Sequence, residues 1–202
     1  IFPRSMITEG LLTMMLAKFG ACGVTFALFA HKSQKLSKTT AALFAPMYAL
    51  CAYMIVQTMY PMWLDCVIAL PRICWGIDSL LKENRFRLLI GSLVYAFVSN
   101  FYIGFMTAIF SVLYFICRYL SLETYTGNTG INIAKKFVTK GAFFGICGIV
   151  SAMMSAFMIL PVYNSLQNGK FSFTEPDYSL VNNFDLIDIA RKLFPNTYDT
   201  VR

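Results

Sequence analysis

The stretch from Phe86 to Leu120, FRLLIGSLVYAFVSNFYIGFMTAIFSVLYFICRYL, decides the fold of this chain. As one helix rising about 1.5 Å per residue it would be about 50 Å long, more than a ~30 Å hydrocarbon core accepts even when the helix is tilted. Its first part, Phe86 to Ser99, is short for a full crossing, whereas Phe101 to Leu120 is long enough. The stretch therefore predicts two membrane segments with a break at Ser99-Asn100.

Further apolar runs lie on both sides of this stretch. Of the 202 residues, 57% are hydrophobic and only 13% are charged, against roughly 25% charged in an ordinary soluble domain. The composition and the run lengths predict an all-α membrane protein, a polytopic helical bundle of about six segments. The expected segments span residues 6–30, 39–58, 62–81, 86–99, 101–120 and 137–162.

The basic residues lie mostly between the apolar runs, which is typical of charges that set membrane orientation and not of a nucleic-acid surface. Loops 31–38, 82–87 and 118–140 carry them, whereas the turns at 59–61 and 99–102 carry none. The positive-inside rule therefore predicts three cytoplasmic loops in a bacterial plasma membrane, with the N-terminus and the C-terminal tail outside. Membrane lipid, and no nucleic acid, is the expected partner.

The composition becomes polar after residue 162. Residues 1–162 are therefore expected to form the membrane bundle, and residues 163–202 an extracytoplasmic tail. Within the tail, residues 184–194 predict a short amphipathic helix, because Asn183 can cap its start and its apolar residues share one face.

The sequence contains few residues of the types that form catalytic or metal sites in soluble enzymes. The six cysteines all lie within apolar runs, where we expect them to be packing residues and neither a disulfide framework nor a metal site. His31, the single histidine, lies among lysines and is expected to be a solvated loop residue. No phosphate-binding glycine loop, Ser/His/Asp set or zinc-ligand spacing occurs in the sequence.

Charged side chains inside the apolar runs need a reason, because Lys or Arg at the centre of a membrane helix costs about 2.5–3.5 kcal/mol on insertion scales. Lys18 and Arg72 fall near mid-membrane, and Asp65 precedes Arg72 by two helical turns on the same face. Either a polar, water-accessible cavity faces this stripe or Lys18 pairs with Asp65. Two roles for these charged residues remain open: they bind a substrate, or they form a buried ion network that only locks the helices together. Asp78 is expected to pair with Lys82, one turn further on.

Several strings in the chain resemble the YfhO family of bacterial membrane proteins. The most specific is Ser99-Asn-Phe-Tyr-Ile-Gly104; others are Met62-Trp-Leu-Asp65, Leu70-Pro71 with Gly76-Ile-Asp78, and Leu193-Phe-Pro-Asn-Thr-Tyr-Asp199. That family is similar to the C-type glycosyltransferases (GT-C), multispanning enzymes that take sugar from a polyprenyl-phosphate carrier. The resemblance implies a GT-C-like fold and sugar transfer from a polyprenyl-phosphate donor to a cell-envelope polymer such as teichoic or lipoteichoic acid.

The resemblance also implies where the chemistry lies. In such enzymes an acidic residue in the first external loop activates the acceptor, and this chain is expected to begin beyond that loop, as an internal fragment. The catalytic base is therefore expected upstream of Ile1 and is not assigned. Sugar transfer also needs a cation near the leaving phosphate, from Lys, Arg or a metal, so a divalent cation stays open as cofactor. The residues expected to border the substrate cavity are Lys18, Trp63, Asp65, Arg72, Asn100, Tyr102 and Gly104.

The alternative function is a non-enzymatic transporter or lipid-handling subunit, because secondary transporters also use broken helices with charges near the membrane midplane. An acidic pair in an external loop before Ile1 would favour the enzyme. An inverted repeat of the six segments would favour transport.

Overall fold

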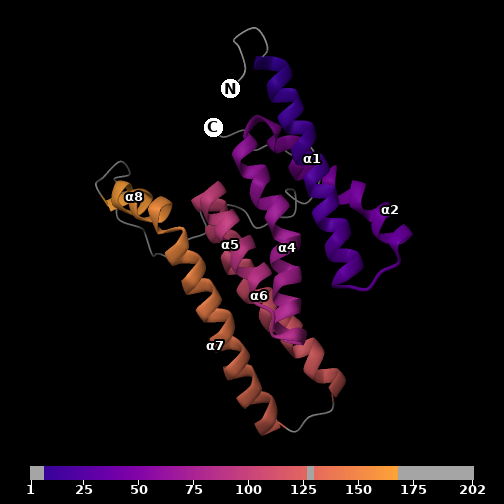
Figure 1. Cartoon of the computed structure of the whole chain (residues 1–202), viewed down its shortest axis with the longest axis vertical. Coiled ribbons are helices and arrows are strands. Elements are labelled where there is room, and N and C mark those ends of the chain that lie inside the picture. The colour runs from indigo at the N-terminus through magenta and orange to yellow at the C-terminus, as the bar shows by residue number, and fades with distance from the viewer. Residues whose placement is uncertain (1–6, 127–129, 168–202) are drawn as a thin grey trace, which may run out of the picture. The chain divides into compact units, whose positions relative to one another are not determined.

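The computed structural model describes residues 7–126 and 130–167, with side chains described outside 123–134 and 166–167. These residues form helices and turns without a strand, which confirms the predicted helical class (Figure 1). The predicted tail helix at 184–194 lies outside the described residues. The helices are α1 (Ile7–Lys32), α2 (Lys38–Ala49), α3 (Ala52–Val56), the 3-10 helix η2 (Gln57–Met59), α4 (Pro61–Glu83), α5 (Arg87–Ser99), α6 (Phe101–Thr126), α7 (Gly130–Met154) and α8 (Ala156–Gln167).

Within the described part of the chain, four stretches are long and apolar enough to cross a membrane: Ile7–Lys32, Lys38–Met59, Phe101–Leu122 and Lys135–Met154. Only 6% to 28% of their apolar windows is buried inside the bundle. Their apolar side chains therefore point outward, as those of lipid-facing helices do. α5 is shorter than these four stretches and α4 carries several charges along its length, so the total of six crossings stays a prediction.

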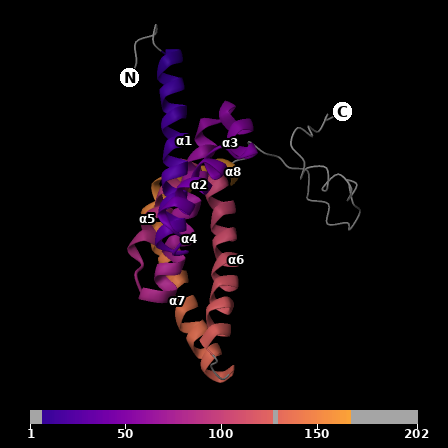
Figure 2. The ribbon, with the colours of Figure 1, turned by 90° about the vertical axis from the view of Figure 1, so that its right-hand side faces the viewer.

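The predicted break at Ser99-Asn100 is confirmed. α5 ends at Ser99, Asn100 adopts an extended conformation (φ −158°, ψ 113°), and α6 begins at Phe101 and runs as one long helix (Figure 2). The Asn100 side-chain Oδ1 accepts a hydrogen bond from the Ile103 backbone N–H at 3.1 Å. Asn100 therefore caps the start of α6, the position where an asparagine side chain stabilises a helix most.

Two other predicted segments are interrupted as well. Segment 39–58 breaks where Cys51 becomes extended (φ −63°, ψ 155°) between α2 and α3. Pro46 lies in the last turns of α2 and has no N–H to donate, which weakens the helix just before the break. Segment 137–162 breaks at Ser155, after which α8 turns away from the axis of α7 (Figure 1).

α4 is the central helix and contacts α1, α5, α6 and α7. α1 runs parallel to it, because Lys18 contacts Asp65 near the start of α4 and Ser33 contacts Asp78 near its end. The chain between them, α2 and α3, returns to the level of Lys18, near the middle of α1, where α4 begins. The alternating direction expected of a multi-pass bundle is therefore present in its first half.

Two glycines bring α5 close to its neighbours. A Cβ added to Gly76 of α4 would lie 2.7 Å from Leu89 Cα, and one added to Gly104 of α6 would lie 2.8 Å from the Ala96 carbonyl oxygen. Small residues of this kind let helix backbones approach closely, which is a main source of helix association in membranes. α5 is thereby packed tightly between α4 and α6.

Lysines link the helices at the end of the bundle where α4 finishes, which we call the basic end. Lys82 Nζ donates to the Ser33 carbonyl oxygen at 3.4 Å, just after α1. Lys140 of α7 donates to the Leu80 carbonyl oxygen at 3.2 Å and to Asn84 Oδ1 at 2.6 Å. A cation at the C-terminus of a helix is favoured by the helix dipole. The predicted cytoplasmic loops thus meet at one end of α4.

Candidate functional site

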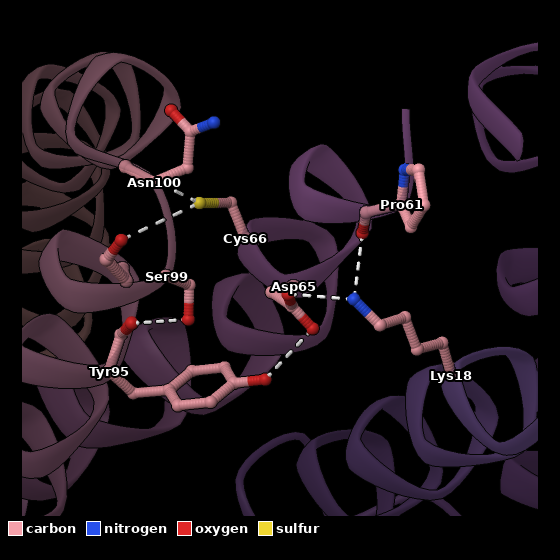
Figure 3. Close-up of polar contacts among 8 residues, drawn as sticks. Lys18, Pro61, Asp65, Cys66, Tyr95, Ser99 and Asn100 are labelled. Atoms are coloured by element: carbon pink, nitrogen blue, oxygen red, sulfur yellow. Dashed lines mark hydrogen bonds and ion pairs between the residues drawn. The ribbon is translucent and has the colours of Figure 1, made fainter. Parts of the chain in front are cut away.

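Lys18 of α1 and Asp65 of α4 form an ion pair, with Lys18 Nζ 2.8 Å from Asp65 Oδ2 (Figure 3). Their side chains are 16% and 20% exposed. Lys18 Nζ also donates to the Pro61 carbonyl oxygen at 2.8 Å, in the first turn of α4. The pairing of Lys18 with Asp65, one of the two arrangements that the sequence left open, is confirmed.

Tyr95 completes the surroundings of Asp65. Its hydroxyl donates to Asp65 Oδ1 at 3.2 Å, so both carboxylate oxygens have a protein donor (Figure 3). Tyr95 lies on α5 and reaches Asp65 because α5 runs antiparallel to α4. Sequence reasoning missed Tyr95: it lies in an apolar run, and nothing in the spacing connects it to a carboxylate 30 positions earlier.

The Asn100 turn reaches the same end of α4 through Cys66, the residue after Asp65. Cys66 Sγ lies 3.7 Å from the Ala96 carbonyl oxygen and 4.0 Å from the Asn100 carbonyl oxygen (Figure 3). A thiol is a weak donor, so these contacts indicate close packing more than strong bonding. The structure thus brings the break between α5 and α6 next to the ion pair, at the end of α4 opposite to the basic end.

Two aromatic residues lie at the start of α4. Trp63 stacks on Tyr60 with ring centroids 5.1 Å apart and planes inclined by 22°. Trp63 is half-buried and precedes Asp65 by two positions, so the two lie in the same turn of α4 but on different sides of the helix. Tyr102 is 63% exposed on the first turn of α6.

Two predicted site residues stand apart from this arrangement. Gly104 is buried, and the close approach that it allows is to Ala96 of α5, so we assign it to helix packing. Arg72 is half-buried two turns beyond Asp65 and makes no hydrogen bond or ion pair with any described residue. It is therefore the one predicted cation that the structure leaves without a protein partner among the described residues.

A second charged cluster, near the basic end, corrects the prediction for Asp78. The Asp78 side chain is 2% exposed, and its Oδ1 accepts a hydrogen bond from Arg118 Nε at 2.8 Å. Ser33 Oγ and Gln34 Nε2 donate to its Oδ2, the latter at 3.1 Å. The predicted pair with Lys82 is wrong, because Lys82 contacts the Ser33 carbonyl oxygen instead.

This cluster holds three helices together. Tyr114 OH of α6 lies 3.4 Å from Asp78 Oδ2, so Asp78 joins the end of α1, α4 and α6. Arg118, expected in a loop, lies inside α6. A buried carboxylate with this many donors is strongly coupled to its partners, and we assign Asp78 a structural role. The one-turn spacing suggested Lys82 as the partner of Asp78, whereas the actual partner, Arg118, lies 40 positions further along the sequence.

No group of three or more His, Cys, Asp or Glu side chains lies together among residues 7–126 and 130–167 with described side chains. The six cysteines are free thiols, and four of them are buried. Independently of any metal, the ammonium of Lys18 lies 2.8 Å from Asp65 Oδ2.

These features together define a multi-pass helical membrane protein: apolar helices with outward-facing side chains, interrupted segments, and paired charges within the bundle. The family described as Bacterial membrane protein YfhO matches residues 1–202, the whole length of the chain, and the chain belongs to that family. No curated protein and no solved structure matches it.

Proposed function

We propose that this chain is part of a membrane glycosyltransferase-like protein that transfers sugar from a polyprenyl-phosphate donor to a cell-envelope polymer such as teichoic or lipoteichoic acid. Family membership supports the class of reaction, through the resemblance of the family to C-type glycosyltransferases. The observation that carries the proposal is the Lys18–Asp65 pair, held within the bundle beside Tyr95 and the Asn100 turn.

Lys18 is proposed to bind the phosphate of the donor. An ammonium has three N–H donors, and two of those on Lys18 are used by Pro61 and Asp65. The third is available to a phosphate oxygen, where a fixed positive charge stabilises the negative charge that develops as the sugar leaves. Asp65 has both oxygens engaged, so we assign it to positioning Lys18 and not to proton transfer.

The aromatic residues are proposed to bind the sugar. A sugar ring packs its C–H face on an aromatic ring, and the stacked Tyr60–Trp63 pair offers such a surface within one turn of Asp65. In the reaction the acceptor oxygen bonds to the anomeric carbon while the bond from that carbon to the phosphate oxygen breaks. The acceptor proton passes to a general base. The polyprenyl chain lies in lipid, which the outward-facing apolar helices contact.

The test is transfer of labelled sugar from a polyprenyl-phosphate donor by the purified full-length protein in lipid vesicles. Lys18→Gln keeps a polar side chain but removes the cation, and we expect the rate to fall by about 100-fold or more, as on removal of one transition-state donor. Lys135→Gln removes one exposed lysine from α7 and should leave the rate unchanged. Equal rates for both variants would exclude Lys18 from the transfer site.

The alternative, a transporter or lipid-handling subunit, is favoured by a different observation. The helices are interrupted at Cys51, Asn100 and Ser155, and interrupted helices recur at the substrate sites of secondary transporters. Movement of a labelled polyprenyl-phosphate lipid between vesicle leaflets, without transfer of its sugar, would support this function over the enzymatic one.

A further inference from the structure

We infer that the basic end of the bundle contains a binding site for an anionic membrane phospholipid, separate from the Asp65 site and independent of the proposed sugar transfer. Two cavities of about 600 Å³ and about 210 Å³ adjoin there. Trp75 and Ser79 of α4 line both. One face of the last turns of α4 is therefore the common wall of a two-part site.

The smaller cavity carries an excess of positive charge. Its two carboxylates already have arginine partners: Asp78 is 2.8 Å from Arg118 Nε, and Glu83 is 3.3 Å from Arg85 Nε. The lysines have no carboxylate partner among the described residues, so an anionic group is the ligand that their charge favours. These lysines are Lys32, Lys35 and Lys82.

The loop that follows Lys32 and carries Lys35 is held in place. Ser33 and Gln34 both donate to Asp78, and the His31 ring nitrogen Nδ1 lies 2.9 Å from the Leu36 carbonyl oxygen across the loop. Lys35 adopts a left-handed conformation (φ 56°) at its tip. Because the loop is ordered before a ligand arrives, less conformational entropy is lost on binding.

The larger cavity adds an apolar surface to this charge. Trp75, Phe86 and Leu88 line it together with Arg85 and Arg87. A free phosphate ion would gain nothing from the apolar side chains. A phospholipid, in contrast, places its phosphate beside lysine or arginine and packs the start of its acyl chains against the apolar side chains. Basic pockets between membrane helices bind acidic headgroups in this way, on the side that the basic loops predict to be cytoplasmic.

The test measures lipid binding to the full chain in detergent by native mass spectrometry. Phosphatidylglycerol should bind at least tenfold more tightly than phosphatidylcholine. Lys32→Gln/Lys82→Gln should weaken phosphatidylglycerol binding by roughly 25-fold, about fivefold per lysine. The matched control Lys135→Gln/Lys136→Gln removes the same charge from exposed positions on α7 and should leave binding unchanged.

Three outcomes would overturn the site. Equal binding of both lipids would show that the site does not recognise the charge of the headgroup. An equal loss of phosphatidylglycerol binding in both double variants would show that the lipid responds to general surface charge and not to this site. Inorganic phosphate that binds as tightly as phosphatidylglycerol would show that the apolar wall is not used. Lys35→Gln, an exposed loop change, provides a second variant if the double variant does not fold, and should weaken binding about fivefold.

Discussion

Lys18 Nζ lies 2.8 Å from Asp65 Oδ2, and this contact connects α1 to α4 across 47 positions of the chain. Either charge alone would be unfavourable at this depth in a membrane helix. Together with the Pro61 carbonyl oxygen and the Tyr95 hydroxyl, they form a polar group within an otherwise apolar contact. The first run of the chain can therefore carry a lysine near its middle.

The first prediction concerns the energy of this pair. Lys18→Met or Asp65→Leu alone should destabilise the protein by about 2 kcal/mol, between the values for exposed and fully buried pairs, because each leaves one charge without its partner. The double variant should regain most of this loss, since apolar residues often replace a buried pair without penalty. Thermal unfolding of the four proteins in detergent gives the coupling energy. Additive losses would show that the two side chains do not interact.

The second prediction separates the two acidic residues near the end of α4. Asp78→Ala should destabilise by about 3–5 kcal/mol, because it leaves Arg118 and the other donors unpaired around a 2% exposed position. Glu83→Ala should change stability by less than about 1 kcal/mol, because its pair with Arg85 is exposed. Similar losses in both variants would contradict the assignment of Asp78 as the anchor of three helices.

The third prediction tests the packing of α5. Gly76→Ala and Gly104→Ala should each destabilise by about 1–3 kcal/mol, since the new methyl group meets backbone atoms at 2.7 and 2.8 Å. Gly91→Ala is the control, because nothing lies within 4 Å of its added Cβ. Alanine is also the better helix former, so this variant should be neutral or more stable by up to about 1 kcal/mol. A tolerated alanine at position 76 would place α5 further from α4.

The fourth prediction is the orientation in the membrane. With the native cysteines replaced, a cysteine at position 37 lies in the predicted cytoplasmic loop, and one at position 172 lies in the tail beyond the described residues. A membrane-impermeant thiol reagent on intact cells should modify the cysteine in Ser172→Cys and spare the one in Ser37→Cys. The reverse pattern would invert the whole topology.

Features that follow from length and depth were accessible to sequence reasoning. The stretch from Phe86 to Leu120 could not be one crossing, so a break was required, and Asn100 provides it by capping α6. Lys18 and Asp65 lie too deep to remain unpaired, so their pairing was one of the two arrangements considered. In the first case the physical cost of the alternative decided, whereas in the second it left a polar cavity and the ion pair open, and the structure shows the ion pair.

Features that depend on helix neighbours were not accessible. The interruptions at Cys51 and Ser155 fall in apolar runs whose length already suits one membrane crossing. The length of these runs therefore gave no indication of a break. Tyr95 reaches Asp65, and Arg118 reaches Asp78, only because of how α5 and α6 pack on α4. Spacing within one helix instead suggested Lys82 as the partner of Asp78.

The measurement that tests the central claim most directly is glycosylation of the cell-envelope polymer by full-length Lys18→Met/Asp65→Leu at wild-type membrane level. Since apolar replacement should restore the stability that either single change removes, this variant separates a packing role from a role in transfer. If the pair positions a cation for the donor phosphate, polymer glycosylation should fall by about 100-fold or more in the double variant. Wild-type glycosylation in that variant would contradict the claim and leave the pair only the role of locking α1 to α4.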